Sequence, residues 1–395
     1  MKRLAVLGST GSIGSSTLEV ADAFPGDFEI FGLAAGHDSG LFRQQITTHR
    51  PAVIAVARAE DARALATDFP DIECGWGTDG LTRVACCEKV DTVVAAMTGS
   101  SGLETIVSAI RASKNIALAN KECLVVAGEL MTNEAARAGI ELLPVDSEHC
   151  AIHQALRAGP IETVSRLFLT ASGGPFRRWS VEQTSRATVR DALDHPTWKM
   201  GRKISVDSAT MMNKGFEIFE AHHFFGVPED RIEILIHPQS LIHSMVEYVD
   251  GSVIAQLAVN DMKIPILHAL SHPRRLASPL PPLDLTTTPP MTFEAPDLEK
   301  FPALRLARNV LQEGGELPAV LNAANEVAVE AFLDGCCPFP EIVASVTAIV
   351  DSWSARNRPL VDLDQALTAD REARQLTTQY LRKYLGTAIG SEIRC

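Results

Sequence analysis

Carboxylates at two places in the sequence have the type and spacing of ligands for a hard cation. Asp146 and Glu148 follow a short apolar run, and the alternation of a strand end points both side chains to one side. Glu217 supplies a third carboxylate further along the chain. Mg²⁺ and Mn²⁺ take oxygen ligands from such groups and complete their shells with water and substrate. The alternative role for Asp146 is to cap a helix that begins near Cys150, and the residues alone leave both interpretations open.

Two further stretches combine the groups that bind a phosphate. The run that ends at Glu217 contains Ser208, Asn213 and Lys214, and a second stretch is the glycine-containing turn that begins at Ser172. Lysine supplies a point charge, serine and asparagine donate hydrogen bonds, and backbone N–H groups complete an anion site. Taken alone, either stretch could be an ordinary loop and Lys214 a solvated surface charge.

The segment from His195 to Gly201 has the composition of a lid. It contains Trp198 and Met200 beside proline and glycine, and it shows neither helical nor strand periodicity. An aromatic side chain that closes over a bound substrate excludes water and strengthens the electrostatic interactions below it. The alternative is a surface loop with one packed tryptophan.

Several histidines lie close together in the sequence. These are the pair His222-His223 and the set His237, His243, His268 and His272. A zinc site is one interpretation, but no pair forms a motif such as HExxH. We therefore predict that they are core or surface histidines.

A glycine-rich turn near the N-terminus has the context of a nucleotide site. Gly8, Gly11 and Gly14 follow the apolar run Leu4 to Leu7 and open a helical pattern from Ser16 to Ala23. Glycines there let the backbone approach a pyrophosphate, and the helix N-terminus supplies free N–H groups. The spacing GxxGxxG is a variant of the dinucleotide motif, and the alternative is a tight turn without a ligand.

The end of the second predicted strand should distinguish NAD from NADP. An acid there binds the ribose 2′-OH, whereas a basic residue accommodates a 2′-phosphate. The chain has Gly36, His37 and Asp38 at this place, so His37 favours a phosphate and Asp38 a hydroxyl. The residues alone support both cofactors.

The elements that must position these residues begin with an α/β domain over residues 1–146. Short apolar runs alternate there with helical patterns, which predicts a Rossmann-like, doubly wound parallel sheet that binds ligands outside the carboxyl ends of its strands. The strands are expected at Leu4 to Leu7, Phe28 to Ala34, Ala52 to Val56, Thr92 to Ala95, Ile116 to Leu118 and Glu141 to Pro144.

The rest of the chain divides into three further segments. Residues 147–280 mix helices with strands near 167–174 and 252–259, which predicts an α+β catalytic domain that contains the lid near 195–201. Residues 281–302 are rich in proline and are expected to form an extended linker. Residues 303–395 show helical spacing at 303–312, 319–333, 339–352 and 363–384 and predict a helical bundle.

Composition excludes some classes of protein. The net charge of -13 argues against a nucleic-acid partner, because binding to that polymer needs clustered lysine and arginine. No apolar run approaches the ~20 residues that span a bilayer, so we expect no membrane partner. The cysteines lack metal or redox spacing, and we interpret the pairs Cys86-Cys87 and Cys336-Cys337 as small buried residues. These features favour a soluble protein of the reduced cytoplasm.

Five motifs together resemble one enzyme family, the 1-deoxy-D-xylulose 5-phosphate reductoisomerases. The resemblance extends from residue 1 to about 380, and the run from His195 to Glu217 is its most specific part. The other motifs are Gly8-Ser-Thr-Gly11-Ser-Ile-Gly14, Leu118-Ala-Asn120-Lys121-Glu122, Val145-Asp146-Ser147-Glu148-His149 and Asn322-Ala-Ala-Asn325-Glu326.

The resemblance implies a role for each matched residue. The metal would be bound by Asp146, Glu148 and Glu217, and the substrate hydroxyls and carbonyl would face Lys121, Ser147 and Glu148. The phosphate would lie among Ser172, Ser208, Asn213 and Lys214, covered by His195 and Trp198 with Met200 beside them. The catalytic groups would be Lys121, Glu148, His195 and Trp198, and the residues implied for the dinucleotide are Thr10, Gly11, Ser12, Ile13, Gly36, His37, Asp38, Asn120, Glu122 and Gly201.

The resemblance also implies the reaction. A linear sugar phosphate would rearrange to a branched aldehyde through retro-aldol cleavage and recombination, and NADPH would reduce the aldehyde to 2-C-methyl-D-erythritol 4-phosphate, an isoprenoid precursor. Mg²⁺ or Mn²⁺ would polarise the carbonyl in this isomerase and oxidoreductase chemistry. Members of the family are homodimers, and the apolar strands after Ile234 could form such an interface.

One position departs from the family pattern. The family usually has Lys or Arg followed by Asn after the glycine that matches Gly36, whereas this chain has His37-Asp38. We therefore expect NADPH use with a weaker preference over NADH. Two rival functions share the nucleotide fold: an NADP-dependent semialdehyde dehydrogenase, which needs no metal triad, and a nucleotide-sensing regulator, which needs neither lid nor phosphate site.

Overall fold

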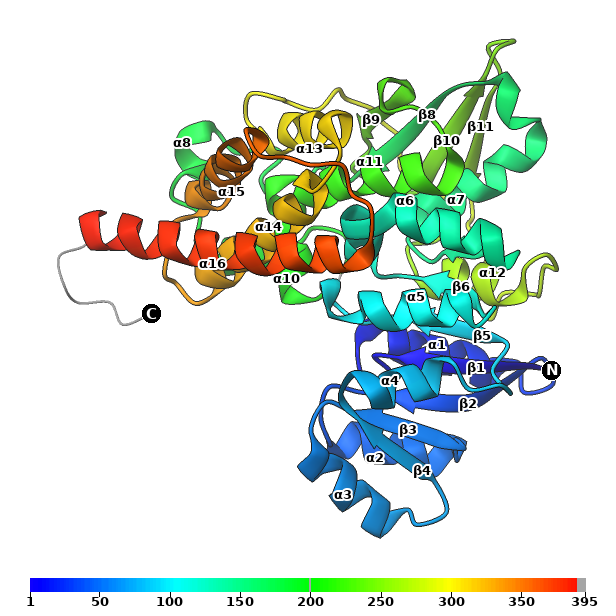
Figure 1. The fold of residues 1–395 in the computed structure, drawn as a ribbon. Coiled ribbons are helices and arrows are strands. Elements are labelled where there is room, and N and C mark those ends of the chain that lie inside the picture. The colour runs from blue at the N-terminus through cyan, green and yellow to red at the C-terminus, as the bar shows by residue number, and fades with distance from the viewer. Residues whose placement is uncertain (199, 389–395) are drawn as a thin grey trace. The chain divides into compact units, whose positions relative to one another are not determined.

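The computed structural model describes residues 1–198 and 200–388, and it contains two compact units (Figure 1). Unit 1 comprises Met1–Cys123, Met131–His153 and Asp261–Leu283. Unit 2 comprises Leu124–Leu130, Gln154–Asn260 and the described residues from Asp284 onward. The division of the chain at residues 146, 280 and 302 stays a prediction, since the compact units follow packing rather than sequence order.

The described residues of unit 1 form a seven-stranded parallel sheet in the order β4-β3-β2-β1-β5-β6-β7. The buried parts of its strands are mostly apolar because helices cover both faces. The predicted parallel sheet is confirmed, while the edge strand β4 was not predicted because its exposed residues lack an apolar run. The strand bounds are β1 Lys2–Leu7, β2 Phe28–Ala34, β3 Val53–Val56, β4 Glu73–Trp76, β5 Thr92–Ala95, β6 Asn115–Leu118 and β7 Leu142–Pro144.

Helices pack on both faces of this sheet. One apolar core joins the strands to α1 (Ser12–Ala23), α2 (Gly40–His49), α3 (Ala59–Asp68) and α12 (Lys263–Ser271). The helices α4 (Gly77–Ala85) and α5 (Leu103–Arg111) contact each other and the sheet. The sequence assigned α12 to the central segment, but α12 packs against α1, β6 and β7.

Two more helices carry predicted site residues of unit 1. Helix α6 (Lys121–Ala138) begins directly after β6, and α7 (Ser147–Ala155) begins shortly after β7. Asn120 caps α6 by accepting a hydrogen bond from the backbone N–H of Cys123. Both helix starts therefore lie at the carboxyl ends of neighbouring parallel strands, where such sheets bind ligands.

Unit 2 contains a mixed four-stranded sheet in the order β11-β10-β8-β9. Strand β8 pairs parallel with β9 and antiparallel with β10. The two strands predicted for this region correspond to β8 and β11. The bounds are β8 Val164–Ala171, β9 Ile232–Ile236, β10 Ile242–Tyr248 and β11 Val253–Leu257, with helices α8 Val181–Thr184, α9 Val189–Leu193, α10 Arg202–Thr210 and α11 Met212–Phe225.

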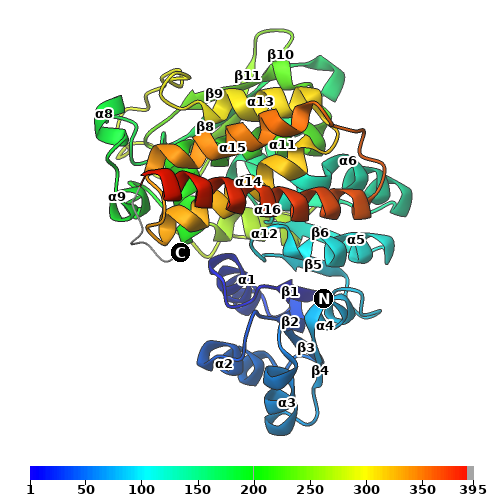
Figure 2. The same ribbon diagram turned by 60° about the vertical axis from the view of Figure 1, so that its left-hand side comes forward.

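The C-terminal helices of unit 2 form the predicted bundle (Figure 2). Helix α14 contacts α13, α15 and α16, and α13 also contacts α11. Their bounds are α13 Ala303–Glu313, α14 Leu317–Leu333, α15 Phe339–Ser354 and α16 Leu363–Ala388. The proline-rich stretch before them contains no helix among its described residues and forms one bridge between Glu294 and Ile236.

Cysteine environments differ from the prediction at three of the four paired positions, and two of these are Cys86 and Cys87, which are half-buried rather than buried. Cys337 is buried, as expected, and burial raises the pKa of its thiol to about 12. Cys336 is half-buried and takes part in a disulfide bond, so the prediction of a reduced apolar residue is wrong there. Cys395 lies outside the described residues. Within the part of the chain that the structure describes, no helix is long and apolar enough to cross a bilayer.

Candidate active site

The glycine-rich turn of unit 1 is closed so tightly that side chains would not fit. A Cβ atom at Gly14 would lie 2.2 Å from the carbonyl oxygen of Gly8, and one at Gly8 would lie 2.6 Å from that of Ala96. Gly11 is the N-cap of α1, makes no side-chain cap hydrogen bond, and is followed by no acidic residue in the first turn. The backbone can therefore approach a pyrophosphate at an uncapped helix start, which fits a dinucleotide.

The predicted dinucleotide contacts Thr10 to Ile13 all lie in this turn. Gly11 and Ser12 are exposed, and Thr10 and Ile13 are half-buried. Gln45 of α2 stabilises the turn, because its side-chain amide nitrogen donates to the backbone carbonyl of Ser9 at 2.9 Å. The Ser9 hydroxyl donates back to the Gln45 side-chain oxygen at 2.8 Å.

The end of β2 contains a basic residue that sequence reasoning missed. Gly36 and His37 are exposed, and Asp38 accepts two hydrogen bonds from Arg43 of α2, at 2.7 and 2.6 Å. Arg43 also pairs with Asp68 at 2.5 Å. The sequence spacing could have indicated Arg43, because it lies one helical turn after the N-cap Ser39 and side chains there point back toward the start of the helix. Arg43 therefore neutralises Asp38 at the place that distinguishes NAD from NADP.

Asn120 joins the ends of two strands in unit 1. Its side-chain nitrogen donates to the carbonyl oxygens of Met97 and Gly99 at 2.7 and 2.8 Å. Asn120 is 1% exposed, and the adjacent Lys121 and Glu122 are also buried. The loop after β5 is thereby held against the start of α6.

Lys121 and Asp146 come together although 25 residues separate them in the chain. The Lys121 Nζ atom donates to Asp146 Oδ2 at 2.6 Å, with both side chains largely buried. His149 Nδ1 lies 3.8 Å from the same oxygen. The Ser147 hydroxyl donates to Glu148 Oε2 at 2.5 Å. Unit 1 thus brings together a cation, two carboxylates and a hydroxyl at the predicted edge of the sheet.

In unit 2, both oxygens of the Glu217 carboxylate are held by neighbours on α11. Asn213 Nδ2 donates to Oε1 at 2.5 Å, and Lys214 Nζ donates to Oε2. Lys214 also donates to the carbonyl of Thr170 at 2.6 Å. Glu217 is fully buried and Lys214 is 4% exposed, so the alternative of a solvated surface lysine is wrong. A buried carboxylate of this kind requires a cationic partner.

His195 connects the predicted lid to the turn after β8. Its Nδ1 atom accepts from the backbone N–H groups of Thr197 and Trp198, at 3.2 and 2.9 Å. The proton therefore resides on Nε2, which donates to the Ser172 hydroxyl at 3.0 Å. Burial lowers the pKa of His195 to about 4, so the imidazole is neutral at physiological pH.

The remaining lid residues are described except for Lys199, which lies outside the described residues. The Trp198 ring lies 6.5 Å from the ring of His243, and Met200 is half-buried. The described residues from His195 to Gly201 form neither helix nor strand. Gly201 is exposed and is the N-cap of α10, which belongs to unit 2.

Ser208 on α10 lies against the Ser172 turn. A Cβ atom at Gly174 would meet the Ser208 carbonyl oxygen at 2.5 Å, so only glycine allows this approach. Helix α10 is itself anchored by Asp207, which accepts from Asn325 of α14 at 2.8 Å and pairs with Lys203 at 2.8 Å. The motif from Asn322 to Glu326 therefore has a structural role, because its Asn325 anchors α10. The sequence alone indicated no role for this motif.

The predicted residues thus form two sets of neighbours, one in each unit. Unit 1 holds Asp146, Glu148, Ser147 and Lys121 close to strand ends that also carry the glycine-rich turn. Unit 2 holds the remaining carboxylate with the predicted phosphate and lid residues, which are Ser172, His195, Trp198, Ser208, Asn213, Lys214 and Glu217. Apart from Lys121, the first set offers a metal ion only carboxylate and hydroxyl oxygens. Oxygen ligands of this kind suit Mg²⁺ or Mn²⁺.

Models of one protein family match most of the chain. The model described as 1-deoxy-D-xylulose 5-phosphate reductoisomerase matches residues 4–128. The model of the C-terminal domain of that enzyme matches residues 142–225. A further model, described as the DXP reductoisomerase C-terminal domain, matches residues 257–376.

Curated relatives carry the same name along their whole length. A 1-deoxy-D-xylulose 5-phosphate reductoisomerase of Pelodictyon phaeoclathratiforme is 50% identical over 383 residues, which cover 96% of this chain and 100% of the relative. The enzyme of Geobacter metallireducens is 48% identical over 383 residues, which cover 96% of this chain and 99% of the relative.

Solved structures agree with this assignment. A DOX-P reductoisomerase in complex with NADPH, fosmidomycin and magnesium matches with a TM-score of 0.92 and 40% identity over 97% of this chain and 99% of that one. The Zymomonas mobilis enzyme in complex with NADPH matches with a TM-score of 0.89 and 40% identity over 96% and 99% of the two chains. This chain therefore belongs to the 1-deoxy-D-xylulose 5-phosphate reductoisomerase family.

Proposed function

We propose that this chain converts 1-deoxy-D-xylulose 5-phosphate to 2-C-methyl-D-erythritol 4-phosphate, with NADPH and Mg²⁺ or Mn²⁺ as cofactors. The observation that carries the proposal is the full-length likeness to a reductoisomerase solved with NADPH, fosmidomycin and magnesium. The product places the enzyme in isoprenoid precursor synthesis. A semialdehyde dehydrogenase is disfavoured because the catalytic carboxylates and the phosphate residues would have no role in it.

The metal ligands of this proposal are Asp146, Glu148 and Glu217. When bound, the cation polarises the substrate carbonyl and stabilises negative charge on it. The protein prepares each carboxylate: Lys121 holds Asp146, Ser147 holds Glu148, and Asn213 with Lys214 holds Glu217. These contacts fix the carboxylates before binding, which reduces the reorganisation needed at the moment of reaction.

The substrate phosphate is assigned to Ser172, Ser208, Asn213 and Lys214. Serine hydroxyls, an amide and an ammonium group are suitable donors, and the neutral His195 orients the Ser172 hydroxyl through its Nε2 proton. Lys121, Ser147 and Glu148 are assigned to the hydroxyl and carbonyl end of the sugar. In this arrangement Lys121 donates to a substrate oxygen and Glu148 accepts or returns a hydroxyl proton.

The lid and the nucleotide turn complete the proposed site. Trp198 and Met200 cover the substrate and exclude water, with Gly201 beside the nicotinamide. Bound NADPH supplies the hydride that reduces the aldehyde. The residues assigned to the dinucleotide are Thr10, Gly11, Ser12, Ile13, Gly36, His37, Asp38, Asn120 and Glu122, to which the structure adds Arg43 as a candidate.

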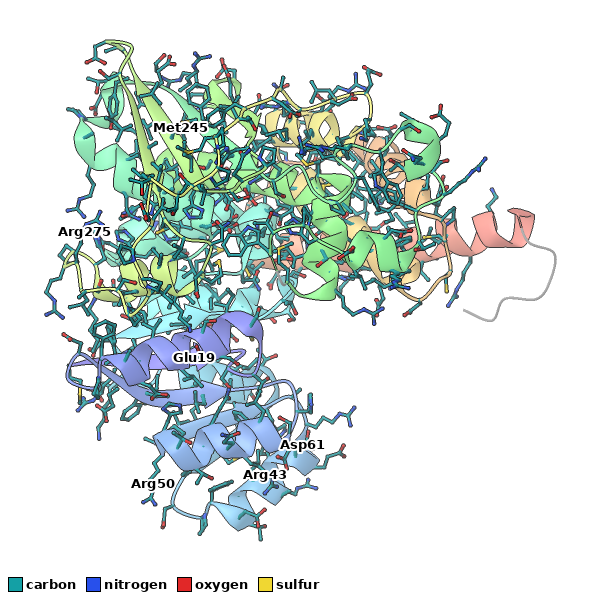
Figure 3. The ribbon with its side chains drawn as sticks, turned by 180° about the vertical axis from the view of Figure 1, so that it is seen from behind. Glu19, Arg43, Arg50, Asp61, Met245 and Arg275 are labelled. Carbon is teal, nitrogen blue, oxygen red and sulfur yellow. The ribbon has the colours of Figure 1, made fainter. Side chains whose placement is uncertain are left out.

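We predict that Arg43 decides how well the enzyme prefers NADPH over NADH. Arg43 pairs with Asp38 and Asp68, and Asp61 accepts a hydrogen bond from the backbone N–H of Asp38 at 3.4 Å. Figure 3 shows Arg43 near Asp61, with Arg50 elsewhere on the same unit. Arg43→Leu should lower kcat/KM for NADPH by about 10- to 100-fold, the value of a charge-assisted hydrogen bond, and change that for NADH little.

The matched control for this prediction is Arg50→Leu. Arg50 is the C-cap of α2, at the opposite end of the helix from the N-cap Ser39. The substitution therefore removes the same charge next to α2 but leaves the pairing of Arg43 with Asp38 intact. The measurement is steady-state kinetics with both nucleotides. An equal loss with NADPH and NADH in Arg43→Leu would show that Arg43 does not contact the 2′-phosphate.

The proposed activity is tested by NADPH oxidation with 1-deoxy-D-xylulose 5-phosphate. We expect absorbance loss that requires Mg²⁺ or Mn²⁺ and stops on chelation, because the carbonyl is not polarised without the cation. Oxidation that persists in chelator would favour the dehydrogenase class. Nucleotide binding without oxidation under either metal would favour a sensor and contradict the proposal.

We also propose a cytoplasmic homodimer. Strand β11 is an edge strand of the sheet in unit 2, and its residues Val253 and Ile254 are 46% and 37% exposed. Next to it, Met245 of β10 (labelled in Figure 3) belongs to a small apolar cluster with Phe168 and Ile242. An exposed apolar edge invites pairing with a second copy.

A further inference from the structure

Three histidines of unit 1 lie together outside the proposed active-site set. His153 is in the last turn of α7, His268 is in the last turn of α12, and His272 is the C-cap of α12. One ligand nitrogen from each ring lies within 4.8 Å of the others. The Nδ1 atom of His153 is 3.0 Å from Nε2 of His268, and the His272 ring centroid lies 5.0 and 5.7 Å from the other two.

The fold produces this cluster in two steps. His268 and His272 are four residues apart, so a helix places them on one face, one turn apart. Helix α12 packs against α1, β6 and β7, which brings that face to the end of α7. The four-residue spacing is a sequence signal for paired ligands, and we overlooked it because the motif sought was HExxH. His268 is buried and His272 is half-buried, so neither is a surface histidine.

The distances suit a cation held by imidazole nitrogens. Zinc binds histidine nitrogen at about 2.0–2.1 Å, so two nitrogens in a tetrahedral shell lie roughly 3.3 Å apart. The 3.0 Å pair of His153 and His268 is already near that separation, and the ligand nitrogen of His272 lies within 4.8 Å of both. At 3.0 Å there is room for one hydrogen between the nitrogens of His153 and His268, so one of the two presents a lone pair to the other.

The ends of two helices and one carboxylate beside the cluster favour a cation. Helices α7 and α12 both end here, and the carbonyl ends of helices carry partial negative charge. Glu141 Oε1 lies 3.7 Å from His272 Nε2, where it can orient the ring or become a fourth ligand. Lys2 opposes binding, because its Nζ atom donates to the carbonyls of Leu270 and His272 at 2.9 and 3.0 Å. These two carbonyls at the C-terminal end of α12 already accept hydrogen bonds from the Lys2 ammonium group.

We propose that His153, His268 and His272 form a zinc site in unit 1, with Glu141 or water as the fourth ligand. Three imidazoles select a borderline transition metal such as Zn²⁺ over Mg²⁺, which requires oxygen ligands. The bound ion links α7 to α12. Because α7 begins at Ser147 and Glu148, this link steadies the helix that carries residues of the proposed active site.

The experiment measures Zn²⁺ binding to the full chain in excess Mg²⁺ with a non-thiol reductant. We expect one Zn²⁺ bound by the wild-type protein, a rise in Tm on its addition, and an intense visible spectrum with Co²⁺, as in tetrahedral sites. His272→Gln and His153→Gln should each weaken Zn²⁺ binding by at least about 100-fold, since even outer-shell partners are worth 10- to 100-fold. Both variants should also lose the Tm rise.

Two controls make the test specific. His49→Gln changes a histidine of α2 in the same unit, which lies beside Asp22 rather than in the cluster, and should bind Zn²⁺ as the wild type does. Glu217→Gln removes a ligand of the proposed catalytic metal and should keep the zinc signal, which separates this site from the proposed function. Equal Zn²⁺ affinity in wild type, His153→Gln and His272→Gln, all with native circular dichroism, would overturn the proposal.

Discussion

Glu217→Gln is expected to lower kcat by about 100- to 1,000-fold, the usual effect of removing one electrostatic stabiliser from a catalytic site. The amide keeps the size of the side chain and can still accept a hydrogen bond, but it loses the charge that a divalent cation needs. The apparent affinity for Mg²⁺ should fall with kcat. The measurement is NADPH oxidation across a range of Mg²⁺ concentrations.

The same change has a cost in stability that must be separated from catalysis. Lys214 is 4% exposed and donates to Glu217, so the amide leaves a buried ammonium without its counter-charge. Breaking a buried pair in this way costs about 3–5 kcal/mol in the free energy of unfolding. The expected signature is therefore a lower Tm together with the loss of activity.

Glu316→Gln provides the matched control. Its carboxylate is also buried in unit 2 and pairs with Arg358 at 2.6 Å, with Trp353 Nε1 donating at 3.1 Å. This variant should lose stability and keep kcat, because Glu316 belongs to the helical bundle. If Glu217→Gln kept kcat near the wild-type value at saturating Mg²⁺, Glu217 would have only a structural role.

Gly14→Ala is expected to impair nucleotide binding strongly. The added Cβ would lie 2.2 Å from the Gly8 carbonyl oxygen and 2.6 Å from Ser9 Cα, and both obstacles are backbone atoms. The turn must open to relieve this overlap, and overpacking of this kind costs about 1–3 kcal/mol. We expect the KM for NADPH to rise by roughly 10-fold or more, since 1.4 kcal/mol is a tenfold change.

Gly26→Ala tests whether this effect is local. Gly26 lies in the loop between α1 and β2, and a Cβ there would meet nothing within 4 Å. That variant should keep both Tm and the KM for NADPH. A Gly14→Ala protein with unchanged nucleotide titration would indicate that the turn does not approach the pyrophosphate.

The core of the fold followed from the sequence because its strands are buried on both faces. Mainly apolar runs mark β2 and β5 at the bounds the structure has, Phe28–Ala34 and Thr92–Ala95. The exposed edge strand β4 has no such run and was missed. Helix α12 was not predicted individually, and its packing against α1, β6 and β7 could not be, because helical periodicity reports one buried face and not which sheet covers it.

For the site residues, too, the sequence predicted the kinds of side chain but not which of them pair. Residue types alone indicated the carboxylates, the phosphate donors and the lid, because each of these chemistries requires particular side chains. The pairing of Arg43 with Asp38 depended on α2 folding back over the end of β2, which a list of residues does not reveal. The burial of Lys214 beside Glu217 likewise overturned its interpretation as a surface charge.

The sequence by itself determined the family, the parallel sheet, the helical bundle and the chemistry that the site residues can perform, because these depend on residue type and on short periodic spacing. The tertiary structure alone decided which charges pair and which side chains from distant segments meet. His153 and His268 are 115 residues apart in the chain, and only the packing of α12 against the sheet brings their nitrogens within 3.0 Å. Packing of that kind is a property of surfaces that several elements form together, and no single segment of sequence contains it.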